Sequence, residues 1–180
     1  MSYGFTKVSE RVIHEEPWFT FLAIEFNGPG GERFERFVFR HPGAVGVVAI
    51  DGQDVVLVRQ FRPAVEIEML EIPAGKLDIP GEEPVVAARR ELLEEAGLEA
   101  LDLVELARFH NSVGFSDEYT LIYLATELIP TEVGPVGVEE QYLAVERVPL
   151  DGVLQLIADG TITDAKSVIG LLSALRYLGR

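Results

Sequence analysis

Apolar residues occur in two kinds of pattern along the chain. Short runs rich in aromatic and β-branched residues predict strands, and apolar residues three and four positions apart predict helices. Near the start, runs 19–26 and 34–39 are separated by Asn27-Gly28-Pro29-Gly30-Gly31, which predicts an antiparallel hairpin, with an earlier strand near 7–13. A hairpin alone is marginally stable in water, so we expect this segment to pack on something else.

The tripeptide His41-Pro42-Gly43 marks the boundary that we expect between two parts of the chain. Residues 1–40 would form a small N-terminal antiparallel β subdomain, and residues 41–180 a second domain. After the boundary, runs 44–50 and 55–58 are continuously apolar, which is typical of strands covered on both faces.

Three later segments have helical spacing. The clearest is 84–96, since Pro84 suits the first turn of a helix and Gly97 suits the residue after its end. A final helix is expected near 165–178, with Asp164 as its N-cap. Apolar residues three and four positions apart are expected to face inward in this helix: Val168, Ile169, Leu172 and Leu175. A short helix is expected at 150–158, with the inward-facing residues Leu150, Val153, Leu154 and Ile157.

Further strands are expected near 103–109 and 120–126. Strands and helices mix along the chain without regular alternation, which predicts a layered α/β or α+β fold.

The composition is that of a globular protein with an acidic surface. The chain has 180 residues, enough for one good core, and 15 basic and 30 acidic side chains give it a net charge of −15. This charge would repel a polyanion, so we expect no nucleic-acid partner. The chain has no cysteine, no apolar run approaching the ~20 residues of a membrane span and no N-terminal signal pattern. We therefore expect no membrane association and a cytoplasmic location.

The predicted helix 84–96 carries three carboxylates on one side. Glu91, Glu94 and Glu95 are related by steps of three and four, which brings them to one stripe of a helix. One interpretation is a solvated face on which Arg90 pairs with Glu94, although such a pair contributes only about 0.3–0.5 kcal/mol. The other is a cage for a hard cation, because magnesium takes oxygen ligands and is commonly shared between carboxylates and substrate phosphates.

Gly75, Glu82 and the run Arg90-Glu91-Leu92-Leu93-Glu94-Glu95-Ala96-Gly97-Leu98 resemble the Nudix box. That pattern is a glycine, five residues, a glutamate, seven residues, then Arg-Glu-apolar-x-Glu-Glu-x-Gly-apolar. Every position from Glu82 onward matches, whereas six residues rather than five separate Gly75 from Glu82. The resemblance implies a Nudix fold, an α/β/α sandwich with a mixed sheet, and metal-dependent hydrolysis of a nucleoside diphosphate linked to another group.

The resemblance also implies a set of metal ligands. Glu91 and Glu95 would bind Mg²⁺, for which Mn²⁺ can substitute, together with the backbone carbonyl of Ala74. Glu94 would contribute directly or through water and is expected among the catalytic residues. Arg90 would orient the glutamates rather than touch the substrate.

Fragments outside the box are similar to ADP-ribose pyrophosphatases in their order and spacing: 41–45, 58–63, 71–75, 114–118 and 164–166. At the position of Glu118, bacterial relatives carry the general base. The alternative that stays open is the pair Glu139 and Glu140, because some Nudix enzymes take their base from a later loop.

Substrate-binding residues follow from the same resemblance. Arg62 would grip a phosphate through paired hydrogen bonds, with Arg59 and Arg40 as further candidates, and Gly114 lies in the loop before Glu118. Trp18 is the single tryptophan, and it is interpreted either as a packing residue or as an aromatic that stacks on adenine.

The implied reaction is the hydrolysis of ADP-ribose to AMP and ribose 5-phosphate by a homodimer. Residues 1–40 would then help to complete the partner's active site. NADH, nucleotide sugars, dinucleoside polyphosphates and oxidised nucleotides are the rival substrates. A non-catalytic module that senses ADP-ribose is the rival outside enzymes.

Overall fold

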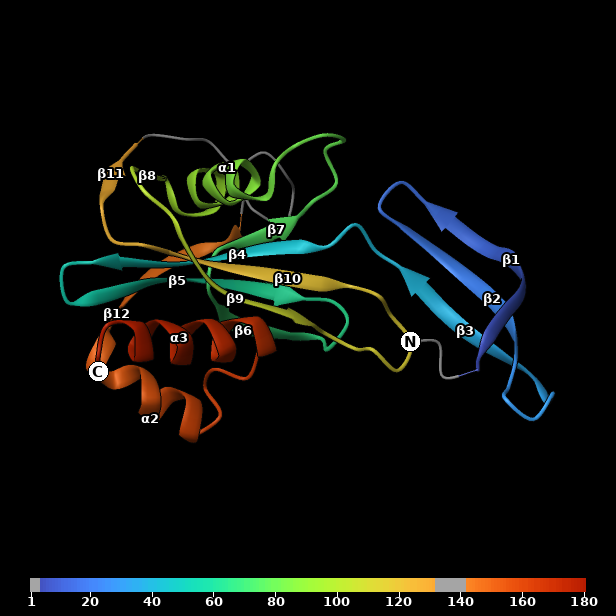
Figure 1. The fold of residues 1–180 in the computed structure, drawn as a ribbon. Coiled ribbons are helices and arrows are strands. Elements are labelled where there is room, and N and C mark those ends of the chain that lie inside the picture. Colours follow the sequence, from blue (N-terminus) through green and yellow to red (C-terminus); the bar gives the residue numbers. More distant parts are fainter. Residues whose placement is uncertain (1–3, 132–141) are drawn as a thin grey trace. The chain divides into compact units, whose positions relative to one another are not determined.

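A computed structural model describes residues 4–131 and 142–180 (Figure 1). The chain divides into two compact units. The first consists of Met1–Gly43 and His110–Tyr119, and the second of Ala44–Phe109 and Thr120–Arg180. The N-terminal unit therefore includes a segment from the middle of the chain, which the sequence did not indicate.

The N-terminal unit is built on a three-stranded antiparallel sheet. Its strands are β1 (Thr6–Glu16), β2 (Phe19–Asn27) and β3 (Arg33–Arg40), in the order β1-β2-β3. The predicted hairpin and the earlier strand are thus confirmed. Segment 110–119 reaches this sheet through an isolated parallel bridge between Phe39 and Ser116.

The second unit is built on a seven-stranded mixed sheet. Five strands lie in the order β12-β5-β4-β10-β9, while β6 pairs with β5 and β7 with β4. The bounds are β4 (Ala44–Asp51), β5 (Asp54–Arg62), β6 (Ile67–Glu71), β7 (Ala74–Lys76), β9 (Val104–His110), β10 (Tyr119–Ala125) and β12 (Ala144–Pro149). Strands β4 and β10 are parallel, and β4 and β5 antiparallel. Two short strands, β8 (Leu98–Ala100) and β11 (Leu128–Pro130), pair separately.

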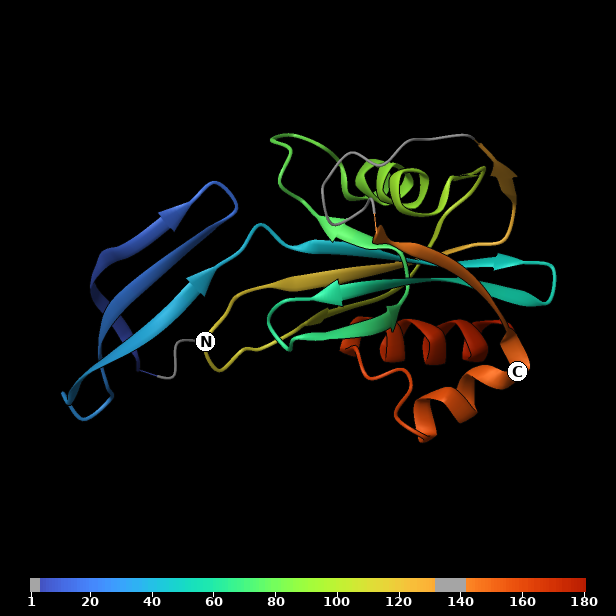
Figure 2. The ribbon, with the colours of Figure 1, turned by 180° about the vertical axis from the view of Figure 1, so that it is seen from behind.

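Helices cover both faces of the mixed sheet. Helix α1 (Pro84–Ala96) lies on one face, and α2 (Val153–Ala158) and α3 (Ala165–Tyr177) lie on the other, after the 3-10 turn η2 (Leu150–Gly152) (Figure 1, Figure 2). The predicted α/β/α sandwich with a mixed sheet is therefore confirmed. No helix in the described part of the chain has the length and apolar character needed to span a membrane.

The helix ends follow their predicted signals. Pro84 opens α1, and Gly97 ends it in the left-handed conformation (φ +63°), donating its N–H to the Leu93 carbonyl. The Asp164 side chain caps α3 by accepting the N–H of Ser167 at 2.9 Å. The three termini are local features, so residues close in sequence suffice to predict them.

The predicted inward faces of α2 and α3 are partly wrong. Leu154 is 54% exposed and Leu172 44% exposed. In α3 the buried positions are Ser167, Gly170, Leu171, Ala174 and Leu175. A Cβ at Gly170 would lie 3.1–3.2 Å from side chains of Ile122, Ile72 and Val48. The helix therefore approaches the sheet through its small residues, a face that a count of large apolar residues does not find.

Candidate metal and nucleotide site

The carboxylates of α1 lie against β7. Glu95 Oε2 accepts the backbone N–H of Ala74 at 2.8 Å. The carboxylate of Glu91 occupies the space that a Cβ at position 75 would need, so Gly75 is required for this close approach. The structure thus brings together, across two adjacent elements, Glu91, Glu95 and Ala74, which the sequence analysis expects among the metal ligands.

Arg90 is surrounded by acids. It donates two hydrogen bonds to Glu82 at 3.1 and 3.0 Å, one to Glu91 at 2.7 Å and one to Glu94 at 3.2 Å. The hydrogen bonds to Glu82 are the largest cause of the raised pKa of Arg90. The same bonds lower the pKa of Glu82. Arg90 therefore holds three glutamates by hydrogen bonds, which is the contact that an orienting role would need.

The six residues between Gly75 and Glu82, one more than in the Nudix pattern, end in a tight turn. The N–H of Glu82 donates to the carbonyl of Ile79 at 3.1 Å, with Pro80 and Gly81 at the two corner positions. Gly81 has φ +80°, which a type II turn requires at that position. Because Glu82 still makes both bonds to Arg90, the longer loop leaves this contact of the box intact.

Burial disfavours the charged form of the carboxyl groups at this site. Desolvation raises the pKa of Glu91, and it raises the pKa of Glu95 to about 8, with the neighbouring charge of Glu91 adding to the effect. One guanidinium, that of Arg90, faces three carboxylates. A divalent cation would supply the missing positive charge, and carboxylate and carbonyl oxygens are the donors that Mg²⁺ prefers. The residues present therefore fit such an ion.

The glutamate side chains do not yet converge on one point. In the described ranges, no group of three acidic or histidine side chains has the geometry to hold a metal ion. Glu91 and Glu94 bond to Arg90, while Glu95 bonds to Ala74. Metal binding would exchange these contacts for coordination, which costs their hydrogen bonds but relieves the repulsion among the acids.

A second network lies where β6 meets the start of α3. Glu71 is 1% exposed and accepts two bonds from Arg62, both at 2.6 Å, and one from Lys166. Burial alone would raise the pKa of Glu71, but the bonds to Arg62 and Lys166 outweigh it and lower this pKa. Sequence reasoning missed Glu71 and Lys166. An acid inside the apolar run Met69-Leu70-Glu71-Ile72 was the available signal, because a buried charge needs a partner.

The predicted substrate-binding arginines are all engaged in ion pairs. Arg62 pairs with Glu71, as described above, and its side chain stays 36% exposed. Arg59 pairs with Glu146 through bonds of 2.5 and 3.2 Å. The third candidate, Arg40, pairs with Asp117 at 2.9 Å. A phosphate would therefore share or displace an existing partner at each of them.

Trp18 and Glu118 both belong to the N-terminal unit. The indole of Trp18 is 45% exposed, and its ring lies 5.9 Å from that of His41. His41 Nδ1 lies 3.8 Å from a carboxylate oxygen of Glu118, whose side chain is 30% exposed. A side chain at position 114 would meet open space among the described residues other than its chain neighbours. The alternative bases Glu139 and Glu140 lie outside the described residues.

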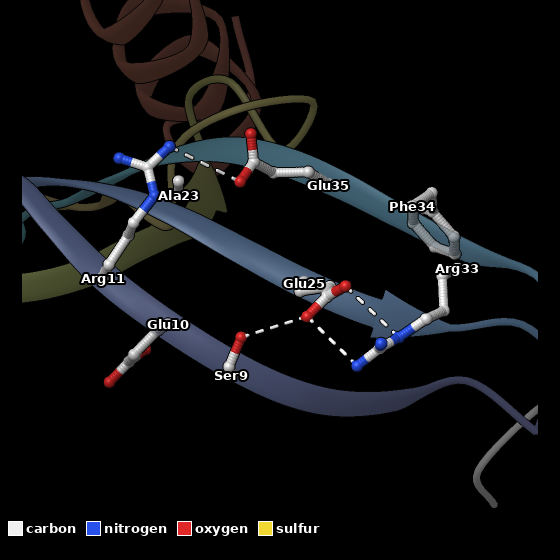
Figure 3. A pocket seen from close by; sticks show the side chains of 8 residues that line it. All are labelled: Ser9, Glu10, Arg11, Ala23, Glu25, Arg33, Phe34 and Glu35. Carbon is white, nitrogen blue, oxygen red and sulfur yellow. Dashed lines mark hydrogen bonds and ion pairs between the residues drawn. The ribbon is translucent and has the colours of Figure 1, made fainter.

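The sheet of the N-terminal unit also has a hollow of about 440 Å³, which none of the predicted site residues lines (Figure 3). Arg11 pairs there with Glu35 at 3.6 Å, and Arg33 with Glu25 at 3.2 Å. Because both arginines are paired, the hollow presents no surplus positive charge to a phosphate.

Comparison with known proteins shows what the chain resembles. The family model of the NUDIX domain matches residues 40–168. The chain is 39% identical over 177 residues to "ADP-ribose pyrophosphatase" of Bacillus subtilis, covering 95% of this chain and 93% of the relative. It is 40% identical over 151 residues to "Methanol dehydrogenase activator" of Bacillus methanolicus, covering 83% and 79%. A solved structure of an "ADP compounds hydrolase" superposes with a TM-score of 0.85 at 25% identity, over 97% of this chain and 94% of that one.

The raised pKa of Glu95 predicts how stability depends on pH without metal. The folded chain binds this proton more tightly than the unfolded chain, whose value is near 4.5. Folding stability is therefore lost as the pH rises from about 4.5 to about 8. In EDTA at pH 8, Glu95→Gln should melt at a higher temperature than the wild type, and the two should converge near pH 4.5.

Thermal unfolding followed by circular dichroism measures this difference. Glu99→Gln removes an exposed acid close to α1 and controls for the change in net charge. A Glu95→Gln protein that is less stable than the wild type at pH 8 would contradict the interpretation of Glu95 as a destabilising buried acid.

Proposed function

The chain belongs to the Nudix family, and on that premise we propose that it hydrolyses the pyrophosphate of ADP-ribose to AMP and ribose 5-phosphate. The observation that carries the proposal is the cluster on α1, where the partly buried Glu91 and Glu95 lie against β7 and Arg90 bonds to Glu91 and Glu94. The match to an ADP-ribose pyrophosphatase, over 95% of this chain and 93% of the relative, supports the choice of substrate.

We propose Mg²⁺ as the cofactor, with Mn²⁺ as a substitute. Glu91, Glu95 and the Ala74 carbonyl would hold it, and Glu94 would contribute directly or through water. When bound, the ion neutralises pyrophosphate charge and lowers the pKa of a coordinated water. The overall charge of −15 does not prevent anion binding, because a bound cation reverses the local field.

The remaining roles fall to side chains of the protein. Glu118 accepts the proton of the attacking water as general base. Arg62 holds a phosphate through its remaining guanidinium N–H groups. Arginine has about five such donors, and Arg62 donates two hydrogen bonds to Glu71. Arg59 and Gly114 are further substrate contacts, and Trp18 stacks on adenine. No covalent intermediate with the protein is needed.

The competing substrates are NADH, nucleotide sugars, dinucleoside polyphosphates and oxidised nucleotides. A non-catalytic module that senses ADP-ribose is the other alternative, but it would have no need for the complete set Glu91, Glu94 and Glu95. The cytoplasmic location expected from the sequence stays a prediction.

Turnover of a nucleotide panel tests the proposed function. With Mg²⁺, ADP-ribose should give AMP and ribose 5-phosphate with a higher kcat/KM than NADH or GDP-mannose. EDTA should abolish this activity, and Glu95→Gln should lose it while remaining folded. A higher kcat/KM for a rival would reassign the substrate. A wild-type rate for Glu95→Gln at limiting Mg²⁺ would refute the metal ligand.

The role of Glu118 predicts a loss in kcat rather than in substrate affinity. General-base catalysis contributes roughly 10²–10⁴ in rate, so Glu118→Gln should lose about that factor in kcat with little change in KM. Glu139→Gln and Glu140→Gln are the matched variants. If one of them shows this loss while Glu118→Gln is nearly wild type, the base belongs to the later loop.

We also propose that the protein is a homodimer whose N-terminal units help to complete the active sites. Phe37 and Phe39 point to one face of β3 and are 52% and 36% exposed, and Phe39 stacks on Phe21 with ring centroids 4.6 Å apart. Phe115 and Trp18, in the same unit, are 56% and 45% exposed. Exposed aromatic groups of this size are typical of an interface, and a twofold dimer would use the same patch on both subunits.

Light scattering at micromolar concentration should give twice the 19.9 kDa mass of the chain, and a monomer would refute the dimer. Site sharing needs a second measurement. Mixing inactive Glu118→Gln with inactive Trp18→Ala should restore activity if each site draws these residues from different subunits. No recovery would mean that one subunit supplies both residues or that Trp18 is a packing residue.

A further inference from the structure

We propose that Asp117 is a positioning residue of the reaction, which fixes the segment carrying Glu118 to the end of β3. The inference rests on the proposed role of Glu118 as the base. It concerns contacts within the N-terminal unit alone, which contains both β3 and segment 110–119.

Asp117 makes three bonds to three consecutive residues at the end of β3. Its Oδ2 accepts from Arg40 Nη1 at 2.9 Å, and its Oδ1 accepts from the backbone N–H of His41 at 3.0 Å. Its own backbone N–H donates to the carbonyl of Phe39 at 3.2 Å. Both carboxylate oxygens and the backbone of Asp117 therefore hold the segment to one place on the strand.

The contacts around Asp117 pass this restraint on to Glu118. The N–H of Phe39 donates to the carbonyl of Phe115 at 2.8 Å, just before Asp117. The N–H of Glu118 donates to the hydroxyl of Ser116 at 3.1 Å, and its carbonyl accepts from Asn111 at 3.1 Å. The backbone of Glu118 is thus held within a segment that the carboxylate of Asp117 attaches to the end of β3.

His41 is a poorer candidate for this role, although its ring is the neighbour of Glu118. Its Nδ1 accepts the backbone N–H of Gly43 at 3.1 Å, so this nitrogen carries a lone pair and has no proton to donate. Its distance of 3.8 Å to Glu118 is also too long for a hydrogen bond. His41 contributes its backbone N–H to Asp117 instead.

The ion pair of Asp117 with Arg40 is exposed, so the loss of Asp117 should affect the reaction rate and the stability of the fold to different degrees. The side chains of Arg40 and Asp117 are 44% and 41% exposed, and pairs of this kind add little to global stability. Displacement of a catalytic group by about 1 Å, in contrast, costs on the order of 10²-fold in rate. Loss of Asp117 should therefore slow the reaction without unfolding the protein.

The variant Asp117→Ala should lower kcat by about 10–100-fold, as loss of an outer-shell partner does elsewhere, with KM changed less than about twofold. The matched control is Glu35→Ala, which removes an equally exposed acid paired with Arg11 in the same sheet. It should keep the wild-type rate. Hydrogen exchange at amides 112–118 should be faster in Asp117→Ala and unchanged in Glu35→Ala, and both should melt within a few degrees of the wild type.

A double-mutant cycle decides whether Asp117 acts through Glu118. If it does, Asp117→Ala should cost little further rate in a Glu118→Gln background, because the group it positions is already inactive. An equal loss of rate in both backgrounds, with Glu118→Gln itself slow, would overturn the inference and leave the base in place. A nearly wild-type Glu118→Gln would instead refute the base, and the inference with it.

Discussion

The arrangement of the site depends on the partial burial of two acids between α1 and β7. Glu91 and Glu95 are four residues apart on one helix, so their side chains lie on the same side of it and both face β7. Gly75 permits the approach, because a side chain there would collide with Glu91. Arg90 can neutralise only part of the charge, since Glu82, Glu91 and Glu94 all bond to it. The fold thus holds more carboxyl groups here than Arg90 can neutralise, and a bound cation would allow Glu95 to ionise.

The second buried acid, Glu71, shows the opposite solution to the same problem. Two cations, Arg62 and Lys166, compensate it fully enough that its pKa is lowered, whereas that of Glu95 is raised. The start of α3 also holds the chain that leads into β7. Ser167 donates to Asp164 at 2.6 Å and accepts the backbone N–H of Ile72 at 2.9 Å. The start of α3 therefore fixes the chain just before Ala74, whose carbonyl is a proposed metal ligand.

Features that depend on residues close together in the sequence could be predicted, whereas contacts between residues far apart in the sequence could not. Helix α1, its ends at Pro84 and Gly97, and the buried strands β4 and β5 follow from neighbouring residues, as does the helical stripe of glutamates. The pair of Lys166 with Glu71 joins residues 95 positions apart, so local patterns do not indicate it. For the same reason the attachment of segment 110–119 to β3 was not expected. The buried face of α3 differs from the predicted one because Gly170 and Ala174 are small enough to let the helix approach the sheet closely, and the pattern of large apolar residues does not indicate this.

Calorimetry of Mg²⁺ binding at pH 7, in two buffers of different ionisation enthalpy, tests most directly whether the buried acids of α1 form a cation site. Glu95 carries a proton at this pH if its pKa is about 8, and a coordinating carboxylate must lose it. Mg²⁺ binding to the wild type should therefore release protons, and binding to Glu95→Gln should release none. Binding heats that are the same in both buffers, or no binding at millimolar Mg²⁺, would contradict it.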